Sequence, residues 1–157
     1  MPTAKEDAQT LVDEFMPFAK QMLVEYQEFL PYGGRMAIDG EIVHVGATTG
    51  EERSESQPLI DILREAHREQ ARVGLIRASC TVYDIRTVPP NRTENQDAIA
   101  FEIDHRDDYS GVVIFPYDIT DAREIVTETP FAVRGEASIF ANEPRNEEAE
   151  QGVDPNA

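Results

Sequence analysis

Lysine is scarce in this chain. Of its 14 basic residues, Lys5 and Lys20 are the lysines and the others are arginines, whereas Asp and Glu together number 31. The formal net charge is therefore -17. Proteins hold nucleic acids and anionic membrane surfaces through Lys and Arg side chains that neutralise phosphates. This charge argues against nucleic acid and membrane as partners, and it favours a basic protein partner.

The sequence leaves three origins of this acidity open. Adaptation to high salt is one, since such proteins carry many carboxylates and few lysines. An inhibitor that presents carboxylates to a basic partner is another. The third is a GC-rich genome, which favours Arg over Lys, combined with an acidic tail. Because a charge excess is usually a solvated surface, we favour the first and third origins over mimicry.

Cysteine and long apolar runs are also in short supply. The single cysteine excludes an intramolecular disulfide. No apolar run approaches the length of a membrane-spanning helix, and residues 1–7 lack the basic and apolar regions of a signal peptide. These absences predict a cytoplasmic protein.

The familiar catalytic motifs are absent as well. The chain has no Gly-x-Ser-x-Gly, His-Glu-x-x-His, Cys-x-x-Cys or dinucleotide-binding glycine pattern. The loop 46–50 is rich in Gly and Thr, but it lacks the Lys-Ser/Thr ending of a phosphate-binding loop and is followed by Glu51 and Glu52. The sequence predicts no cofactor and favours a protein without enzymatic activity.

The length of 157 residues fits one domain. We expect residues 1–141 to form it, with 119–141 as an irregular extension or short added strand that packs back on the body. Residues 142–157 are acidic and poor in apolar residues, which predicts a disordered tail.

Two segments carry the apolar spacing of an amphipathic helix. Between residues 5 and 29, apolar residues recur every three or four positions, which predicts a helix with one face on a core. Pro17 lacks a backbone amide, so we expect a kink or a break there. Pro31 and the Gly33-Gly34 pair end this helix. A second stripe predicts a helix over residues 56–73.

Five strand-like segments complete the pattern. Asp39-Gly40 between two apolar runs is typical of a two-residue hairpin turn, which pairs Met36 with Val43. Residues 75–85, 97–105 and 111–118 alternate apolar and polar side chains, as strands with one buried face do. The sequence therefore predicts an α+β fold, with a five-stranded antiparallel sheet and helices packed mainly on one face.

The order of these elements resembles the profilin-like and roadblock architectures, in which the first hairpin lies beside the last strand of the meander. Four short segments are also similar to a group of small uncharacterised bacterial α+β proteins. They are Phe29-Leu30-Pro31-Tyr32-Gly33, Ser56-Gln57-Pro58-Leu59-Ile60, Asp84-Ile85-Arg86 and residues 97–107. This resemblance implies a fold and a cytoplasmic location, but no site.

The polar face of the predicted sheet is the first candidate site. Side chains alternate along a strand, so Arg77, Thr81 and Tyr83 are expected on one face. Glu102 and Asp104 of the next strand would lie beside them. This face suits a binding groove or a dimer contact, and the alternative is an ordinary solvated surface.

The run 104–108, Asp-His-Arg-Asp-Asp, is the second candidate site. It offers a general base or metal ligands, which would be His105, Asp107 and Asp108. Because Asp104 and His105 point to opposite faces of a strand, a strand end that runs into a charged turn explains the same residues better.

Other chemically distinctive residues fit structural roles. Cys80 lies mid-strand, where a free thiol behaves as a small hydrophobe. His44 and His67 have no partner at metal-ligand spacing. Phe131 and Phe140 are expected to fold back on the sheet rather than dock on a partner.

These features favour a non-catalytic interaction module of the adaptor, immunity or inhibitor type, which binds a protein partner or forms a homodimer. The alternative is a small-ligand sensor or a metal-dependent enzyme that uses the cluster from Asp104 to Asp108.

Overall fold

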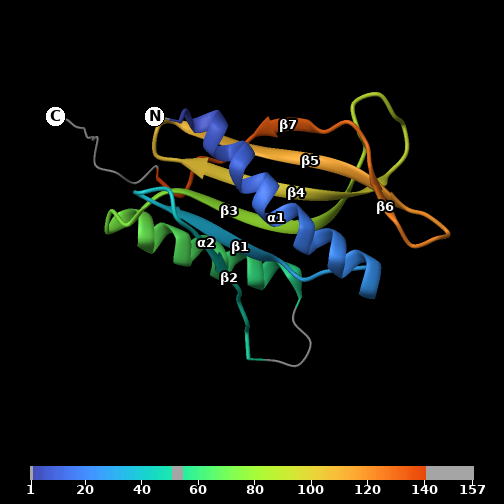
Figure 1. Cartoon of the computed structure of the whole chain (residues 1–157), viewed down its shortest axis with the longest axis horizontal. Coiled ribbons are helices and arrows are strands. Elements are labelled where there is room, and N and C mark those ends of the chain that lie inside the picture. Colours follow the sequence, from blue (N-terminus) through green and yellow to red (C-terminus); the bar gives the residue numbers. More distant parts are fainter. Residues whose placement is uncertain (1, 51–54, 141–157) are drawn as a thin grey trace.

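The computed structural model describes residues 2–50 and 55–140. The predicted acidic tail, residues 142–157, and the Glu51-Glu52 pair lie outside the described residues. Within them the chain forms two helices, α1 (Ala4–Tyr26) and α2 (Ser56–Arg72), and seven strands (Figure 1). The strands are β1 (Tyr32–Ala37), β2 (Ile42–Val45), β3 (Ile76–Thr87), β4 (Gln96–His105), β5 (Tyr109–Ile119), β6 (Ile125–Thr127) and β7 (Phe131–Arg134). Neither helix of this described part combines enough length and apolar character to span a bilayer.

The strands form one antiparallel sheet. Their order is β2-β1-β3-β4-β5-β6, and β7 also pairs with β5. The predicted α+β class and antiparallel sheet are confirmed. The described residues hold seven strands instead of five, because the expected extension contributes β6 and β7. The β1-β2 hairpin lies beside β3, the first strand of the meander, and not beside its last strand.

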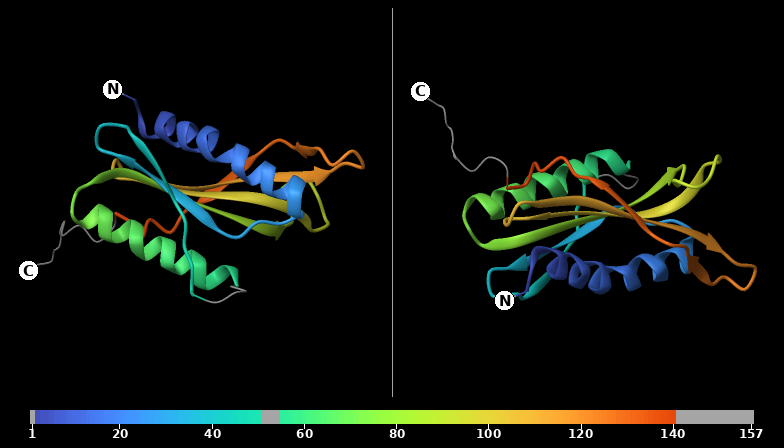
Figure 2. Two further views of the ribbon diagram at one scale, coloured as in Figure 1. Left: turned by 60° about the horizontal axis from the view of Figure 1, so that its bottom comes forward. Right: turned by 90° about the horizontal axis from the view of Figure 1, so that it is seen from above.

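The two helices lie on opposite faces of the sheet (Figure 2), and not mainly on one face. The reason is that β3 and β4 bury side chains on both of their faces. The face toward α1 carries Cys80, Val82 and Phe101. Ser79 and Thr81 are buried on the other face, where α2 packs. The polar face of the sheet, which was predicted to be exposed to solvent or to a partner, is therefore covered along β3 by α2.

α1 is one helix of 23 residues. The Thr3 hydroxyl oxygen accepts the N–H of Glu6 over 3.1 Å, and the Glu6 carboxylate accepts the N–H of Thr3 over 2.8 Å, which caps the first turn. Pro17 does not break the helix into two, because it lies on the exposed side, where water can satisfy the carbonyl that loses its partner. The helix ends at Tyr26, before the predicted residue 29, and Gln27 adopts a left-handed φ of 63°.

Gly33 and Gly34 lie inside β1 and do not end the first helix. A Cβ on Gly34 would lie 1.8 Å from Cζ of Phe15 on α1. A Cβ on Gly33 would lie 2.6 Å from the carbonyl oxygen of Cys80 and 3.2 Å from Nε2 of His67 on α2. The missing side chains therefore let both helices approach the same strand, one on each face.

The β1-β2 hairpin turns through three residues, 38–40, instead of the predicted two. Gly40 has a φ of 95°, which glycine adopts without strain. The strands consequently pair Met36 with Ile42 and not with Val43. A shift of one residue moves every side chain of β2 to the other face, so Ile42 packs on the core and Val43 is exposed.

A bulge at the start of β3 moves another set of side chains. Met36 pairs with Ala78 and Ala37 pairs with Ile76, so Arg77 is an extra residue opposite β1. Ile76 packs beside Ala71 of α2, whereas Arg77 bonds to α1. Arg77 therefore leaves the face on which the alternation placed it.

The expected extension packs back on the body. Phe131 of β7 packs against the cluster of Ala98, Ala100 and Ile114. Phe140 packs against a second cluster that includes Ile76. Both phenylalanines thus contact their own sheet, as the sequence predicted.

Candidate functional site

Arg77 and His105, from the two predicted sites, meet Asp7 of α1 in one buried cluster. The guanidinium of Arg77 donates two hydrogen bonds of 3.0 Å to the Asp7 carboxylate, and Nε2 of His105 lies 2.8 Å from Oδ2 of Asp7. Burial raises the pKa of Asp7, but the hydrogen bonds from Arg77 and His105 and the positive charge of Arg77 outweigh it and hold the pKa below its usual 3.8. The cluster ties the first turns of α1 to the sheet.

Both ring nitrogens of His105 are engaged. The backbone N–H of Asp107 donates to Nδ1 over 3.0 Å, so the ring proton is assigned to Nε2, which donates to Asp7. The Asp107 carboxylate lies 3.8 Å from Nδ1 and is 66% exposed, and Asp108 follows in a left-handed turn. Among residues 2–50 and 55–140, no three His, Cys, Asp or Glu side chains are grouped to hold a metal ion.

The other four residues of the predicted polar face lie beneath or beside α2. Arg64 of α2 donates to both carboxylate oxygens of Glu102, over 2.9 and 2.6 Å, and the Tyr83 hydroxyl donates to the same carboxylate over 3.2 Å. Thr81 and Asp104 are buried, and burial raises the pKa of Asp104. The Arg64–Glu102 ion pair joins α2 to the sheet, and the burial of Thr81 and Asp104 leaves these two residues inaccessible to a partner while α2 is in place.

His67 of α2 lies against the backbone of Cys80, whose side chain is buried on the opposite face, toward α1. Nε2 of His67 donates to the carbonyl oxygen of Cys80 over 3.2 Å. Burial, helped by the charge of Arg35, lowers the pKa of His67 to about 4, so the ring is neutral at pH 7. Burial also raises the pKa of the Cys80 thiol, which suppresses the thiolate needed for nucleophilic chemistry.

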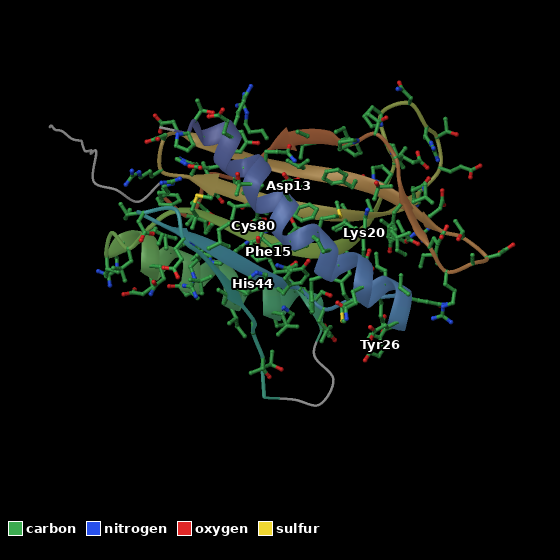
Figure 3. The ribbon with its side chains drawn as sticks, in the orientation of Figure 1. Asp13, Phe15, Lys20, Tyr26, His44 and Cys80 are labelled. Atoms are coloured by element: carbon green, nitrogen blue, oxygen red, sulfur yellow. The ribbon has the colours of Figure 1, made fainter. Side chains whose placement is uncertain are left out.

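Phe15 marks the middle of the face beneath α1 (Figure 3). Its ring lies 4.6 Å from the His44 ring at 64° between planes, and His44 in turn lies 2.8 Å from the Glu14 carboxylate at the surface. Figure 3 also places Tyr26 at the C-terminal end of α1, well away from Phe15. A cleft opens at that end of the helix.

The cleft has a volume of about 1010 Å³. Its walls come from segments far apart in the chain: the C-terminal half of α1, the loop that follows, the start of α2 and the adjoining ends of β3 and β4. Three of its apolar side chains, Phe18, Tyr26 and Leu30, are 43%, 65% and 56% exposed. Large apolar side chains that gather in one concave place mark a binding surface.

Tyr32 organises the aromatic wall of the cleft. Its hydroxyl donates to the carbonyl oxygen of Phe15 over 2.6 Å, which fixes the ring against α1. Phe18 meets Tyr32 with 4.8 Å between ring centroids and 79° between planes, and Phe29 meets it at 5.8 Å and 63°. Phe29 and Tyr32 are themselves buried, at 7% and 8% exposure, so they support the wall from behind and the exposed rings of Phe18 and Tyr26 are the ones that a ligand can contact.

Carboxylates outnumber basic groups in the cleft. The charged lining residues are Glu28, Glu55, Asp84, Asp97 and Arg86. Arg86 lies 2.8 Å from the Asp97 carboxylate, so its charge is already compensated. The cleft therefore keeps an excess of negative charge.

Asp84 is the half-buried carboxylate of this group. The Tyr117 hydroxyl donates to its Oδ1 over 3.1 Å, and within the described part of the chain no salt bridge joins Asp84 to a basic side chain. Burial is the main reason that the pKa of Asp84 is raised to about 6. The charges of Asp97 and Glu28 raise this pKa further, and the hydrogen bond from Tyr117 opposes them.

The cleft residues were missed at the sequence level. Tyr26 and Phe29 fitted the apolar stripe of the first predicted helix, and Asp84 fitted the end of a strand. The available signal was the concentration of aromatic side chains around the helix stop, at Phe18, Tyr26, Phe29 and Tyr32. These four aromatic side chains are more than the single buried face of one helix accommodates.

No protein-family model, curated protein or solved structure matches this chain. An inference about function therefore rests on the chemistry of the cleft. Its aromatic and aliphatic walls can contact an apolar ligand body, and its carboxylates attract positive charge.

Proposed function

We propose that this protein is a non-catalytic binding protein that holds a small organic molecule in the cleft at the C-terminal end of α1. The observation that carries this proposal is the gathering of half-exposed Phe18, Tyr26 and Leu30 around one concavity of about 1010 Å³. Ligand sites in proteins typically enclose roughly 300–1,000 Å³, so this cleft accommodates a metabolite-sized molecule. A bound molecule would cover apolar surface that water otherwise contacts.

The fold supports such a role because it holds the cleft between rigid elements. The Tyr32 ring is fixed by its bond to Phe15, and α1 is tied to the sheet at its other end by Asp7. A preformed apolar wall loses little conformational entropy when a ligand binds. The cleft is therefore suited to an apolar ligand whose shape matches its walls.

Fluorescence of N-phenyl-1-naphthylamine, a neutral apolar probe, tests the proposal. We expect saturable binding to the full chain, with an affinity that falls roughly tenfold in Phe18→Gln and in Leu30→Gln, because each removes an apolar contact worth about 1.5 kcal/mol. Val133→Gln is the matched control, since Val133 is 47% exposed on β7 and does not line the cleft. Equal affinity in all three variants, or no binding to the wild type, would contradict the proposal.

A protein contact along β2 is a second candidate function, in line with an interaction module. β2 pairs with β1, and in the described residues no strand pairs with its other edge, beside which Val43 is 51% exposed. An open edge can add a strand from another chain, including a second copy. Light scattering should then give a dimer mass that Val43→Lys reduces to a monomer mass, and a monomeric wild type would exclude the homodimer.

A further inference from the structure

We propose that the ligand of the cleft carries an alkylated ammonium group, held between the aromatic wall and Asp84. This inference rests on the proposed function, and it adds the chemical class of the ligand. Three features of the cleft lead to it: the excess of carboxylates, the exposed rings of Phe18 and Tyr26, and the lack of a basic partner for Asp84 in the described residues.

The charge of the cleft selects a cation. Four carboxylates line it against one guanidinium, and that guanidinium, on Arg86, is paired with Asp97. An anionic ligand would meet unfavourable potential from Glu28, Glu55 and Asp84. A neutral ligand would leave the half-buried Asp84 without a counter-charge, whereas a cation would supply one.

The aromatic rings narrow the class of cation. A primary ammonium holds its water strongly and needs several hydrogen-bond acceptors at close range. An alkylated ammonium presents apolar alkyl groups and is attracted to the faces of aromatic rings. Phe18 and Tyr26, which are 43% and 65% exposed and line the cleft, provide such faces for a rounded cationic group.

The two recognition elements meet in one place. Asp84, near the C-terminal end of β3, and Phe18, on α1, line the same cleft, although they are distant in sequence. An apolar body attached to the ammonium would extend along Leu30 and Met22, which also line it. The expected ligand is therefore a tertiary or quaternary amine with an apolar substituent.

Ligand-observed NMR titrations with choline and its neutral carbon isostere, 3,3-dimethyl-1-butanol, test this inference. The two compounds have nearly the same shape and differ in charge. We expect choline to bind roughly tenfold more tightly, the usual size of a partly desolvated cation–π and charge contribution.

Two variants locate the effect. Asp84→Asn removes the charge and keeps an acceptor for Tyr117, and Phe18→Leu keeps apolar area but removes a ring. Each should weaken choline binding by roughly fivefold to tenfold and leave 3,3-dimethyl-1-butanol within about twofold. Asp13→Asn is the matched control, because Asp13 lies on the N-terminal half of α1, away from the cleft (Figure 3), and should change neither affinity.

The outcomes separate this inference from the proposed function. If N-phenyl-1-naphthylamine binds in the cleft but choline binds no more tightly than its isostere, the ammonium inference fails and the binding function stands. If choline binds more tightly but Asp84→Asn and Phe18→Leu behave like Asp13→Asn, the cation lies elsewhere and the inference also fails. If the probe and both compounds fail to bind, the proposed function falls together with the inference.

Discussion

Asp84 and Asp7 are two carboxylates with opposite surroundings. Burial, with a further contribution from neighbouring carboxylates, raises the pKa of Asp84, whereas hydrogen bonds from Arg77 and His105 lower the pKa of Asp7. Each shift links protonation to stability, with opposite sign. Asp84 therefore favours folding when protonated, and Asp7 favours folding when ionised.

Asp84→Asn should stabilise the protein at pH 7. The pKa of Asp84 rises from 3.8 to about 6 on folding, so its contribution to stability falls as the pH rises from about 4 to about 6. The variant should melt at a higher temperature than the wild type at pH 7, and the difference should shrink toward pH 4. Thermal unfolding followed by circular dichroism measures this, with Asp13→Asn as control. A variant that melts at a lower temperature than the wild type at pH 7 would contradict the view that the ionised form of Asp84 is destabilised by its surroundings.

Asp7→Asn should destabilise the protein. The side chain of Arg77 is 11% exposed, and it would lose its counter-charge in a buried place. We expect a loss of about 3 kcal/mol in the free energy of unfolding at pH 7, measured by urea denaturation. Because the folded pKa of Asp7 lies below 3.8, this contribution is present above that pH and disappears as the pH falls through the lower value. A loss of stability no larger than that of the exposed Asp13→Asn would show that the cluster of Asp7, Arg77 and His105 does not hold α1 on the sheet.

At the scale of elements, β1 is the strand on which both helices converge. Its Gly34 makes room for the Phe15 ring of α1, and Gly33 makes room for α2. The same approach places Tyr32, the next residue toward the N-terminus, where its hydroxyl reaches the carbonyl of Phe15. The position of the aromatic wall thus depends on the glycine pair.

Gly34→Ala should therefore disturb packing between α1 and β1. The added Cβ would overlap the Phe15 ring, and we expect a loss of about 2–3 kcal/mol in the free energy of unfolding. Adding Phe15→Leu to Gly34→Ala should recover part of that loss, because a shorter side chain leaves room for the Cβ. A double-mutant cycle by urea denaturation measures the coupling. Strictly additive effects of the two substitutions would contradict the proposed contact.

The spacing of apolar residues along the chain predicted the helices and strands better than it predicted how they pack and pair with one another. The helical stripes and the three meander strands were evident from periodicity, because each depends on neighbours in the chain. The register of β2 was wrong, since one extra residue in the turn at Gly40 moves every side chain to the other face. The alternation of apolar and polar residues gave no indication of the bulge at Arg77. This bulge determines on which face of the sheet the Arg77 side chain lies.

The candidate site could not be predicted from local pattern for a similar reason. The cleft forms where the end of α1, the start of α2 and the ends of β3 and β4 meet. That meeting depends on the two helices taking opposite faces of the sheet (Figure 2), whereas one face was expected to be wet. Two residues of the expected polar face instead bond to the helices, Glu102 to Arg64 of α2 and Arg77 to Asp7 of α1.

For the whole molecule, the net charge of -17 sets the response to salt. Several arginines are already paired with carboxylates, including Arg64, Arg77 and Arg86, so the excess acid remains uncompensated. Repulsion among exposed carboxylates weakens as ions screen them.

The melting temperature should consequently rise by several degrees between about 0.05 and 1 M KCl, because the Debye length falls from over 10 Å to about 3 Å. Thermal unfolding over a KCl series measures the rise. Unfolding in dilute buffer that only molar salt reverses would identify adaptation to high salt as the origin of the acidity. A melting temperature that stays constant or falls with salt would contradict this electrostatic account.

The most direct test of the central claim is to map where a neutral apolar ligand binds. Backbone amide shifts of the full chain, measured by two-dimensional NMR during titration with N-phenyl-1-naphthylamine, report the binding place residue by residue. The cleft predicts saturable shifts concentrated in residues 26–32 and 84–86. Shifts concentrated along β2, or absent at saturating probe, would contradict a ligand site at the end of α1.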